Sequence, residues 1–220
     1  VPPMYGAPGA TGIVLANSAG LEASFISSDW GQTFKKIRDG HHTYEIGDLG
    51  SIIVMSHYLQ FTDHFIYSLN EGKTFGQCNF TFESDNSLTI ENIRIEPTFN
   101  SEEFLIHGHS SGGTSYLIHV DFGNLRERVC GEQDYEMWSP SPRKCLLGEH
   151  VQYKRKKPDA ECFNPMQQVL EVKGTECNCS RVDYECDVCF APSIVEGIST
   201  CVPVAGCVRD NPCESAKESF

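Results

Sequence analysis

Long hydrophobic runs are missing from this chain of 220 residues, and positive charge is scarce. No segment reaches the ~18 apolar residues that a membrane-spanning helix needs. Lysine and arginine together number 17 against 30 aspartates and glutamates, which gives a formal net charge of −13. Because nucleic acids and anionic membranes are bound by basic surfaces, neither is expected as a partner. The ligand expected from this balance is neutral, cationic or a protein.

Cysteine is almost absent from the first part of the chain, where residues 1–129 contain only Cys78. The polar residues that follow contain an even number of closely spaced cysteines. This pattern is typical of a small region that is cross-linked by disulfides because it buries too little apolar surface. Such bonds persist in oxidising compartments, so the chain is expected outside the cytosol. The ten remaining cysteines are Cys130, Cys145, Cys162, Cys177, Cys179, Cys186, Cys189, Cys201, Cys207 and Cys213.

Metal binding is the alternative use for some of these residues. Cys177 and Cys179, with Cys186 and Cys189, are spaced closely enough for a tetrahedral zinc site, but six further cysteines in the same segment favour disulfides. His107 and His109 alternate along an expected strand and so share one face. The sequence shows no third ligand beside them, so a solvent-facing position is favoured over a metal site. No metal and no cofactor is predicted.

Helical periodicity is also missing from residues 1–129, which read as short strands between turns. The turns are marked by glycine, serine, asparagine and aspartate, and the runs between them are apolar, β-branched or aromatic. These runs predict a mainly β fold. They are Ile13–Ala16, Ile52–Met55, Phe65–Tyr67, Phe104–Ile106 and Tyr116–Val120.

One motif occurs twice in this region, with the pattern Ser-x-Asp/Asn-x-Gly-x-Thr-Phe. The two copies start 41 residues apart, at Ser27 and Ser68, which is about the length of one four-stranded propeller blade. Their shared positions are Ser27, Asp29, Gly31, Thr33 and Phe34 in the first copy, and Ser68, Asn70, Gly72, Thr74 and Phe75 in the second.

The residue types of this motif suit a tight turn rather than a ligand site. The Asp or Asn side chain can bond the backbone of the turn, and the glycine supplies a positive φ. The phenylalanine is expected to start the next strand with its ring turned into the core. Residues 113–116 repeat the offset of 41 without the acidic residue, and are either a third copy or a chance match.

Together these features resemble a known family. The two boxes, the stretch of residues 44–55 and the ending at residues 120–130 look like the last part of a Vps10-type propeller. The cysteine-rich part is similar to the ten-cysteine module of sortilin-family receptors. The segments that carry this second likeness are Cys130 with Asp134, Tyr135 and Trp138, then Cys145–Gly148, Tyr153–Asn164, Cys177–Cys179 and Asp183–Asp187.

The resemblance implies a partial β-propeller over residues 1–128, the last blades of a ten-bladed ring, and a disulfide-rich module over residues 129–220. It also implies three pairings, Cys130 with Cys162, Cys145 with Cys177, and Cys186 with Cys201. Cysteine follows earlier here than is usual for the family, at Cys189, Cys207 and Cys213. The pairing among Cys179, Cys189, Cys207 and Cys213 therefore stays open.

The chain is expected to be a piece of a longer protein. Its first residues have neither the basic start nor the apolar run of a signal peptide, and residues 1–129 hold material for about three blades where even a small propeller closes with at least four. The missing N-terminal part of the propeller is thus an expected partner. Cys78 is expected to bridge to that part or to a nearby blade loop. A transmembrane helix is expected beyond Phe220.

The function that the resemblance implies is that of a sorting receptor in the secretory pathway lumen, a single-pass type I membrane protein rather than an enzyme. Such a receptor binds protein or peptide cargo in the Golgi and releases it in an endosomal, lysosome-like or vacuolar compartment. A homodimer is a further implied partner. The eight histidines make release at low pH a testable hypothesis. The ligand-binding residues stay unknown.

A sialidase-like glycosidase is the alternative function, since such enzymes also carry these boxes on propellers. It would need convergent arginines, for which Arg38, Arg94, Arg126 and Arg128 are the candidates. The basic run of residues 154–157 is expected to be a solvated face. Asn79 and Asn178 each begin an N-glycosylation sequon, and Asn79 is the better candidate because a cysteine stands at the centre of the second sequon.

Overall fold

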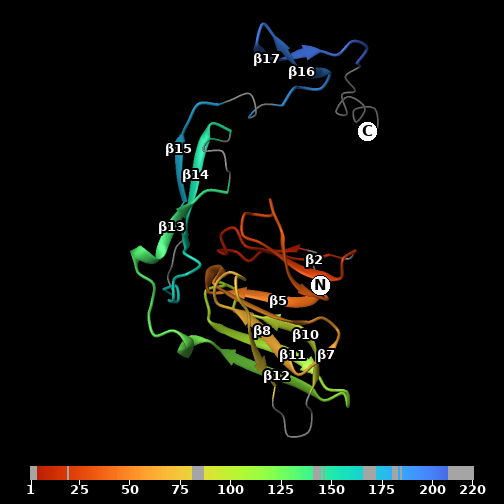
Figure 1. The fold of residues 1–220 in the computed structure, drawn as a ribbon, viewed down its shortest axis with the longest axis vertical. Coiled ribbons are helices and arrows are strands. Elements are labelled where there is room, and N and C mark those ends of the chain that lie inside the picture. The colour runs from red at the N-terminus through yellow and green to blue at the C-terminus, as the bar shows by residue number, and fades with distance from the viewer. Residues whose placement is uncertain are drawn as a thin grey trace, which may run out of the picture. The chain divides into compact units, whose positions relative to one another are not determined.

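A computed structural model describes residues 4–18, 20–80, 87–140, 145, 147–165, 172–179, 183 and 185–207 of the chain. It divides the chain into two compact units, the first formed by residues 1–140 and 152–172 and the second by residues 141–151 and 173–220. Strands dominate the described residues (Figure 1), which confirms the mainly β fold class. Within the described ranges, no helix has the length and apolar character needed to cross a bilayer.

Three four-stranded antiparallel sheets make up most of the first unit. The first sheet has the order β1 (Met4–Tyr5), β2 (Val14–Ser18), β3 (Ala23–Ser27) and β4 (Lys35–Asp39). The second has the order β5 (His42–Gly47), β6 (Ile52–His57), β8 (His64–Ser68) and β9 (Gly76–Asn79). The third has the order β7 (Phe61–Thr62), β10 (Leu88–Arg94), β11 (Glu103–His109) and β12 (Ser115–Asp121). Each of the five predicted runs overlaps one of these strands, so the strand predictions are confirmed.

The third sheet takes its edge strand β7 from the connection between β6 and β8 of the second sheet. Leu88 of β10 lies opposite Thr62, and Thr89 lies opposite Phe61. The Thr62 hydroxyl donates a hydrogen bond of 2.9 Å to the carbonyl oxygen of His64 as the chain returns to the second sheet. The two sheets are therefore joined by the chain itself as well as by packing.

The middle strand β6 explains how the sheets stack. Its side chains point alternately to opposite faces, so Ile52 and Val54 enter one hydrophobic cluster while Ile53 and Met55 enter another. The first cluster is completed mainly by residues of the third sheet, such as Phe104, and the second by further residues of the second sheet, by Leu15 and Ile26 of the first sheet and by the loop before β2. A strand buried on both faces reads as an unbroken apolar run. Sheets stacked face to face in this way are the blades of a partial propeller.

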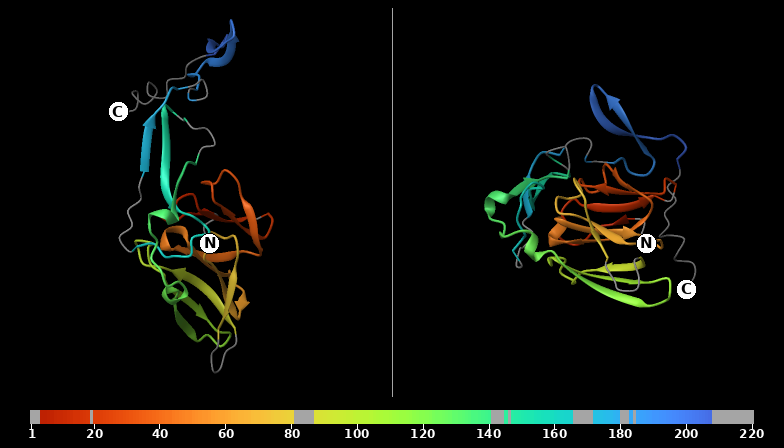
Figure 2. Two further views of the ribbon diagram at one scale, coloured as in Figure 1. Left: turned by 60° about the vertical axis from the view of Figure 1, so that its left-hand side comes forward. Right: turned by 60° about the horizontal axis from the view of Figure 1, so that its bottom comes forward.

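The cysteine-rich segment contributes shorter elements. Strands β13 (Tyr135–Trp138), β14 (Glu149–Lys156) and β15 (Val172–Glu176) form a three-stranded sheet, in which the left view of Figure 2 shows β14 beside β15. In the second unit, β16 (Phe190–Val195) and β17 (Ile198–Pro203) form a hairpin, seen in the right view of Figure 2. Its two-residue turn, Glu196 and Gly197, has positive φ at both positions, as in a type I′ hairpin turn. The 3-10 turns are η1 (Asp48–Gly50), η2 (Gly123–Leu125) and η3 (Glu132–Asp134).

Four disulfides cross-link the described residues. Cys130–Cys162 lies in the first unit, and Cys145–Cys177, Cys186–Cys201 and Cys189–Cys207 lie in the second. The first three are the pairs that the family resemblance implies, and the fourth joins two of the four cysteines whose pairing was open. Cys179, expected in a disulfide, is bonded to no described cysteine, because every other described cysteine of the module already has a partner. Cys213 lies outside the described residues.

The two compact units do not divide at the predicted boundary between residues 128 and 129. Residues 129–140 and 152–172, which belong to the predicted module, pack with the three sheets as part of the first unit. The domain boundary between residues 128 and 129 therefore stays a prediction. The packing places the start of the cysteine-rich segment against the propeller blades, and this contact buries the oppositely charged Asp48 and Lys156 together with Asn164.

Candidate functional site

The first Ser-x-Asp box closes the turn between β3 and β4. The Ser27 hydroxyl oxygen accepts hydrogen bonds from the backbone N–H groups of Asp29 and Gly31, at 3.2 and 2.8 Å. The Asp29 carboxylate accepts one from the backbone N–H of Thr33 at 2.9 Å and one from the Thr33 hydroxyl at 2.5 Å. These bonds to Thr33 lower the Asp29 pKa to about 2. The side chains of Ser27, Asp29 and Thr33 are therefore used inside the turn.

The second box repeats this geometry between β8 and β9 with an amide. The Ser68 hydroxyl oxygen accepts from the Gly72 N–H at 2.8 Å, and the Asn70 side-chain oxygen accepts from the Thr74 N–H at 2.9 Å. Gly72 has φ +75°, and the residue before it, Glu71, also has positive φ at 55°. A turn with two positive φ values matches the twist of the flanking strands. The hydrogen bonds support the structural interpretation of both boxes.

The expected inward direction of the box phenylalanines is wrong for one of them. Phe75 is partly buried and packs against the hydrophobic cluster between the first two sheets, and the Arg38 guanidinium lies over its ring at 5.1 Å. Phe34, in contrast, is 39% exposed. The two sites differ because the second box belongs to the middle sheet, where a neighbouring blade covers the turn.

We expect the carboxylate of the first box to be replaceable by an amide but not by a methyl group. Asp29→Ala removes both acceptors for Thr33 and should lower the melting temperature by a few degrees. Asp29→Asn should retain most of the stability, because Asn70 in the second box accepts from the backbone N–H of Thr74 and donates to its hydroxyl. Thermal unfolding followed by circular dichroism compares the two variants. Equal losses in both would show that the carboxylate charge, and not the turn bonding, matters.

Asp48 is the centre of the buried polar contact between the blades and the cysteine-rich segment. It lies in η1, just after β5, and is fully buried. Its carboxylate accepts a hydrogen bond from the backbone N–H of Asn164 at 2.8 Å and lies 3.4 Å from the Lys156 ammonium. The Asn164 amide in turn donates to the Asp48 carbonyl oxygen at 2.8 Å. A charge is thus buried in this contact together with a counter-charge and hydrogen bonds.

Lys156 connects this contact to the Cys130–Cys162 disulfide. Its ammonium donates to the carbonyl oxygen of Cys162 at 2.8 Å, and the residue is only 7% exposed. Burial lowers the Lys156 pKa to about 8. Arg126 reaches the same carbonyl at 2.8 Å and also donates to the carbonyl oxygen of Leu69 in the second sheet. The loop around Cys162 is therefore held by two cations.

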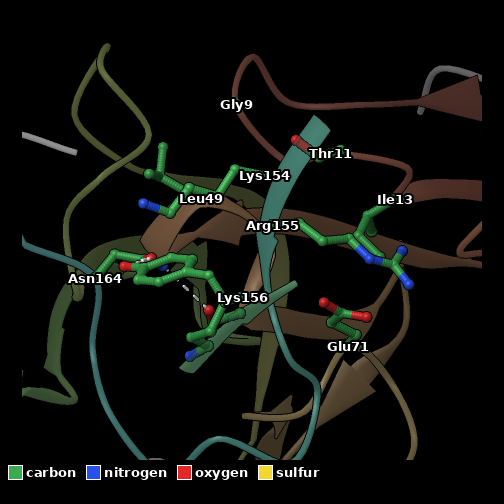
Figure 3. Close-up of a pocket in the computed structure, with 11 residues that line it drawn as sticks. Gly9, Thr11, Ile13, Leu49, Glu71, Lys154, Arg155, Lys156 and Asn164 are labelled. Carbon is green, nitrogen blue, oxygen red and sulfur yellow. Dashed lines mark hydrogen bonds between the residues drawn. The ribbon is translucent and has the colours of Figure 1, made fainter. Parts of the chain in front are cut away.

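A small pocket adjoins these groups, and Figure 3 shows Lys156, Asn164 and Glu71 among the side chains that line it. Burial raises the pKa of Glu71 to about 7, against the opposing effect of the nearby Arg155 and Lys156. The free volume is about 20 Å³, which is room for about one water molecule. A pocket of this size is typical of a packed contact between two segments. It is too small to bind a peptide or a protein.

The prediction that the basic run is a solvated face is wrong. Lys154 pairs with Glu132 at 2.8 Å, and Arg155 pairs with Glu136 at 2.9 Å while its guanidinium lies 4.5 Å from the centre of the Trp138 ring. The side chains of Lys154 and Arg155 are 13% and 14% exposed. The run begins in the last three residues of β14, and its charges face acidic partners on η3, β13 and the blades. A sequence pattern of like charges cannot show where those partners lie.

The four arginines proposed for the glycosidase alternative have separate partners. Arg38 stacks on Phe75, and Arg126 holds the loop around Cys162. Arg128 forms a two-point ion pair with Asp134, with distances of 2.5 and 2.9 Å. Arg94 lines a different pocket, with Tyr5 and Glu45. The structure does not bring these four arginines together into one binding site.

One group of three potential metal ligands lies close together among the described residues, namely Cys130, Asp134 and Cys162. The two sulfur atoms are bonded to each other, and the Asp134 carboxylate is held by Arg128, which lowers its pKa to about 2. This group is therefore a cross-link beside an ion pair.

The glycosylation candidates stay predictions. Asn79, at the end of β9, and Asn178 are both exposed. The threonine and serine of their sequons, Thr81 and Ser180, lie outside the described residues. The ligand-binding residues are unknown from the sequence, and the contacts described above do not identify them.

Sequence reasoning missed the buried contact around Asp48. A signal was present, because Asp48 is a charged residue just before the strongly apolar strand β6. Its partners Lys156 and Asn164 follow more than 100 residues later. Separations of this kind leave no local pattern.

The fold and the buried contact around Asp48 define a class of protein: stacked propeller blades braced by a disulfide-cross-linked segment. Comparison with known families agrees with this class. Residues 4–93 match the family described as "Sortilin, neurotensin receptor 3", and residues 95–220 match "Sortilin, neurotensin receptor 3, C-terminal". The chain belongs to the sortilin/Vps10 family.

Curated relatives are similar over most of the chain. A "Vacuolar protein sorting/targeting protein 10" of Paracoccidioides brasiliensis (strain Pb18) is 35% identical over 228 residues, covering 92% of this chain and 15% of the relative. A protein of the same name from Aspergillus terreus is 37% identical over 185 residues, covering 77% of this chain and 12% of the relative. The chain thus spans only about 15% of the length of the relatives it matches.

Proposed function

We propose that this chain is a lumenal part of a transmembrane receptor that binds protein cargo in the Golgi and delivers it to endosomal, lysosome-like or vacuolar compartments. The observation that carries the proposal is the match of 92% of the chain to a relative named for vacuolar protein sorting and targeting. Four disulfides support an oxidising, lumenal location. The proposal extends to localisation in a single-pass membrane protein of the secretory pathway.

The buried contact around Asp48 supports a bracing role for the cysteine-rich segment. Blades that stack only on one another leave strand edges and apolar faces open at the ends of the stack. Here the segment around Cys162 binds the second sheet through Asp48 and Arg126, so the propeller is held from one side. The remaining blades of the propeller and a second copy of the receptor are the further partners that we propose.

The glycosidase alternative is not favoured. The relatives are named for sorting, and the four candidate arginines have separate partners. We therefore propose a binding function without catalysis.

A capture experiment tests the sorting function. The complete ectodomain containing this chain is immobilised, exposed to lysate of the secretory pathway at neutral pH, and eluted in mildly acidic buffer. We expect soluble vacuolar or lysosomal proteins in the acid eluate and their absence from a control resin carrying an unrelated disulfide-rich ectodomain. Turnover of a sialoside by the same ectodomain, with no cargo retained, would contradict the proposal.

We expect the folding stability of the chain to fall in acid, partly because of His42. This residue is 2% exposed, its ring stacks on His57 at 4.6 Å, and burial lowers its pKa to about 4. The unfolded chain binds a proton at this residue below about pH 6.5, whereas the folded chain resists it. Stability is therefore lost progressively as the pH falls from about 6.5 to about 4.

We expect His42→Asn to lose less stability than the unaltered chain between pH 7 and pH 5. The measurement is the urea midpoint at each pH, followed by tryptophan fluorescence. The raised pKa of Glu71 acts in the opposite direction, since acid removes a charge that burial disfavours. Glu71→Gln is thus the matched control and should steepen the acid loss. Identical pH profiles for His42→Asn and the unaltered chain would contradict the role of His42.

A further inference from the structure

A second pocket is lined by residues of β1, β5 and β10, one strand from each of the three sheets of the first unit. Its free volume is about 260 Å³, against about 20 Å³ for the pocket beside Glu71. Two of the residues that line it, Glu91 and Arg94, are exposed, so a solute can reach it. The larger volume leaves room for the end of a side chain from another molecule, where the smaller pocket holds about one water.

Glu45 of β5 brings a buried carboxylate to this pocket, since the residue is only 4% exposed. Its Oε1 accepts hydrogen bonds from the Tyr5 hydroxyl and from the backbone N–H of Ile46, the latter at 3.0 Å. Both donors therefore use the same oxygen, and no donor among the described residues is bonded to Oε2. A polar atom of a buried residue is costly without a hydrogen bond. Oε2 is thus a place for a donor from another molecule.

The charged neighbours of Glu45 leave this oxygen available. Arg94 of β10 lies near enough to favour the ionised form of Glu45, but the two form no ion pair among the contacts of the described residues. Glu91, at a β-bulge in β10, has its carboxylate 3.0 and 3.1 Å from Nδ1 of His107 and His109. These two histidines are 46% and 38% exposed. Glu45 is therefore the carboxylate of this pocket that faces no cationic side chain at contact distance.

The other groups of the pocket favour a cation that donates N–H bonds. The rings of Tyr5 and Tyr44 lie 6.0 Å apart, and both line the pocket, where ring faces attract a cation. An ammonium group has three donors, and Thr43 and Asn92 bring further acceptor oxygens. A guanidinium fork is matched by two carboxylate oxygens at once, whereas an ammonium is a point donor. Since Glu45 has one free oxygen, the ammonium is the better match.

We propose that this pocket binds a primary ammonium group, that of a lysine side chain of a protein ligand, with Oε2 of Glu45 as its acceptor. That the ligand is cargo rests on the proposed function, whereas the recognition of the ammonium rests on the pocket alone. Burial raises the pKa of the Glu45 carboxyl, against the opposing effect of the bonds from Tyr5 and Ile46 and of the nearby Arg94. Protonation removes the charge that attracts the ammonium, so acid should release the ligand.

Saturation-transfer NMR tests the site, with N-acetyl-lysine amide as the probe and the complete ectodomain containing this chain at pH 7.5. Glu45→Gln keeps an oxygen for Tyr5 and Ile46 but removes the charge, and should weaken binding at least about tenfold. Arg94→Ala removes a like charge and should tighten binding, which a misfolded variant would not do. Glu103→Gln is the matched control, because it changes a carboxylate of β11 that is 61% exposed, and should leave the affinity unchanged.

The form of the probe and the pH supply further comparisons. The trimethylated lysine probe keeps its charge without N–H donors and should bind about tenfold more weakly. The arginine probe should also bind more weakly than the lysine probe. At pH 4.5, which lies below the raised pKa of Glu45, more than half of the carboxyl is protonated. Binding should then fall at least about twofold, and the Glu45→Gln variant should show no such fall.

Three results overturn the proposal. They are no saturation transfer to the lysine probe from the unaltered ectodomain, equal affinity in Glu45→Gln and the unaltered ectodomain, and equal binding of the trimethylated probe. Because the probe is a small molecule, none of these results depends on the capture of cargo. Probe binding without any captured cargo would contradict the sorting function and support the ammonium site, so the two failures are distinguishable.

Discussion

Asp48→Ala should destabilise the first unit by about 3–5 kcal/mol, the cost of leaving a buried charge without its partner. Asp48 has no exposure to solvent, and Lys156 is 7% exposed. Without the carboxylate, Lys156 loses its counter-charge, and the backbone N–H of Asn164 loses its acceptor. The segment around Cys162 would then keep the bonds made by the Asn164 amide and by Arg126, without the buried charge pair.

Urea unfolding followed by tryptophan fluorescence measures this loss, because both tryptophans, Trp30 and Trp138, lie in the first unit. The control is Glu132→Ala, which removes a carboxylate that is 87% exposed from its pair with Lys154 and should cost less than about 1 kcal/mol. The double variant Asp48→Ala, Lys156→Met should be less damaged than Asp48→Ala alone, since it removes both charges. If Asp48→Ala costs no more than Glu132→Ala, the buried contact does not hold the segment.

Removal of the Cys130–Cys162 disulfide should destabilise the same unit by about 4 kcal/mol, the loop-closure value for a cross-link of this length. The two cysteines are 32 positions apart, and both are buried. The bond also positions the Cys162 carbonyl oxygen, to which Lys156 and Arg126 donate. The Cys130→Ala, Cys162→Ala variant should therefore lose both the cross-link and part of the polar contact.

Fluorescence-detected unfolding again gives the measurement, and the second unit provides the control. Replacing Cys186 and Cys201 by alanine removes a disulfide of that unit and should leave the tryptophan transition unchanged. A midpoint that is equal for the Cys130–Cys162 variant and the unaltered chain would show that the cross-link adds nothing to the blades. Reduction of all disulfides should lower the midpoint as the Cys130–Cys162 variant does.

Local features of the chain could be predicted because their causes are local. The box turns depend on residues within five positions of one another, such as Ser27 and Gly31. The buried strand β6 can be recognised in the sequence as a continuous apolar run, because both of its faces are covered. The cysteine spacing, read through the family resemblance, implied three of the four disulfides present. The fourth, Cys189–Cys207, could not be chosen among four cysteines of similar surroundings.

Predictions failed or fell short where a distant partner decides the outcome. The basic run looked solvated because its acidic partners, including Asp48, lie elsewhere in the sequence. The ring of Phe34 stays exposed although Phe75 is partly buried, and the two motifs are the same. The histidines of β11 lacked a third group until the bulge at Glu91 brought one from the neighbouring strand.

The amino-acid sequence alone determined the strand-forming runs, the turn chemistry of the two boxes and the family resemblance, and it predicted an oxidising environment. Each of these follows from side chains that are near neighbours or from composition. The tertiary structure alone decided which charges are buried, which carboxylate faces which histidine, and how the segment around Cys162 is attached to the blades. Those contacts join residues as far apart as Asp48 and Asn164, at a separation of 116. Their energies depend on burial and geometry, which exist only after the chain has folded.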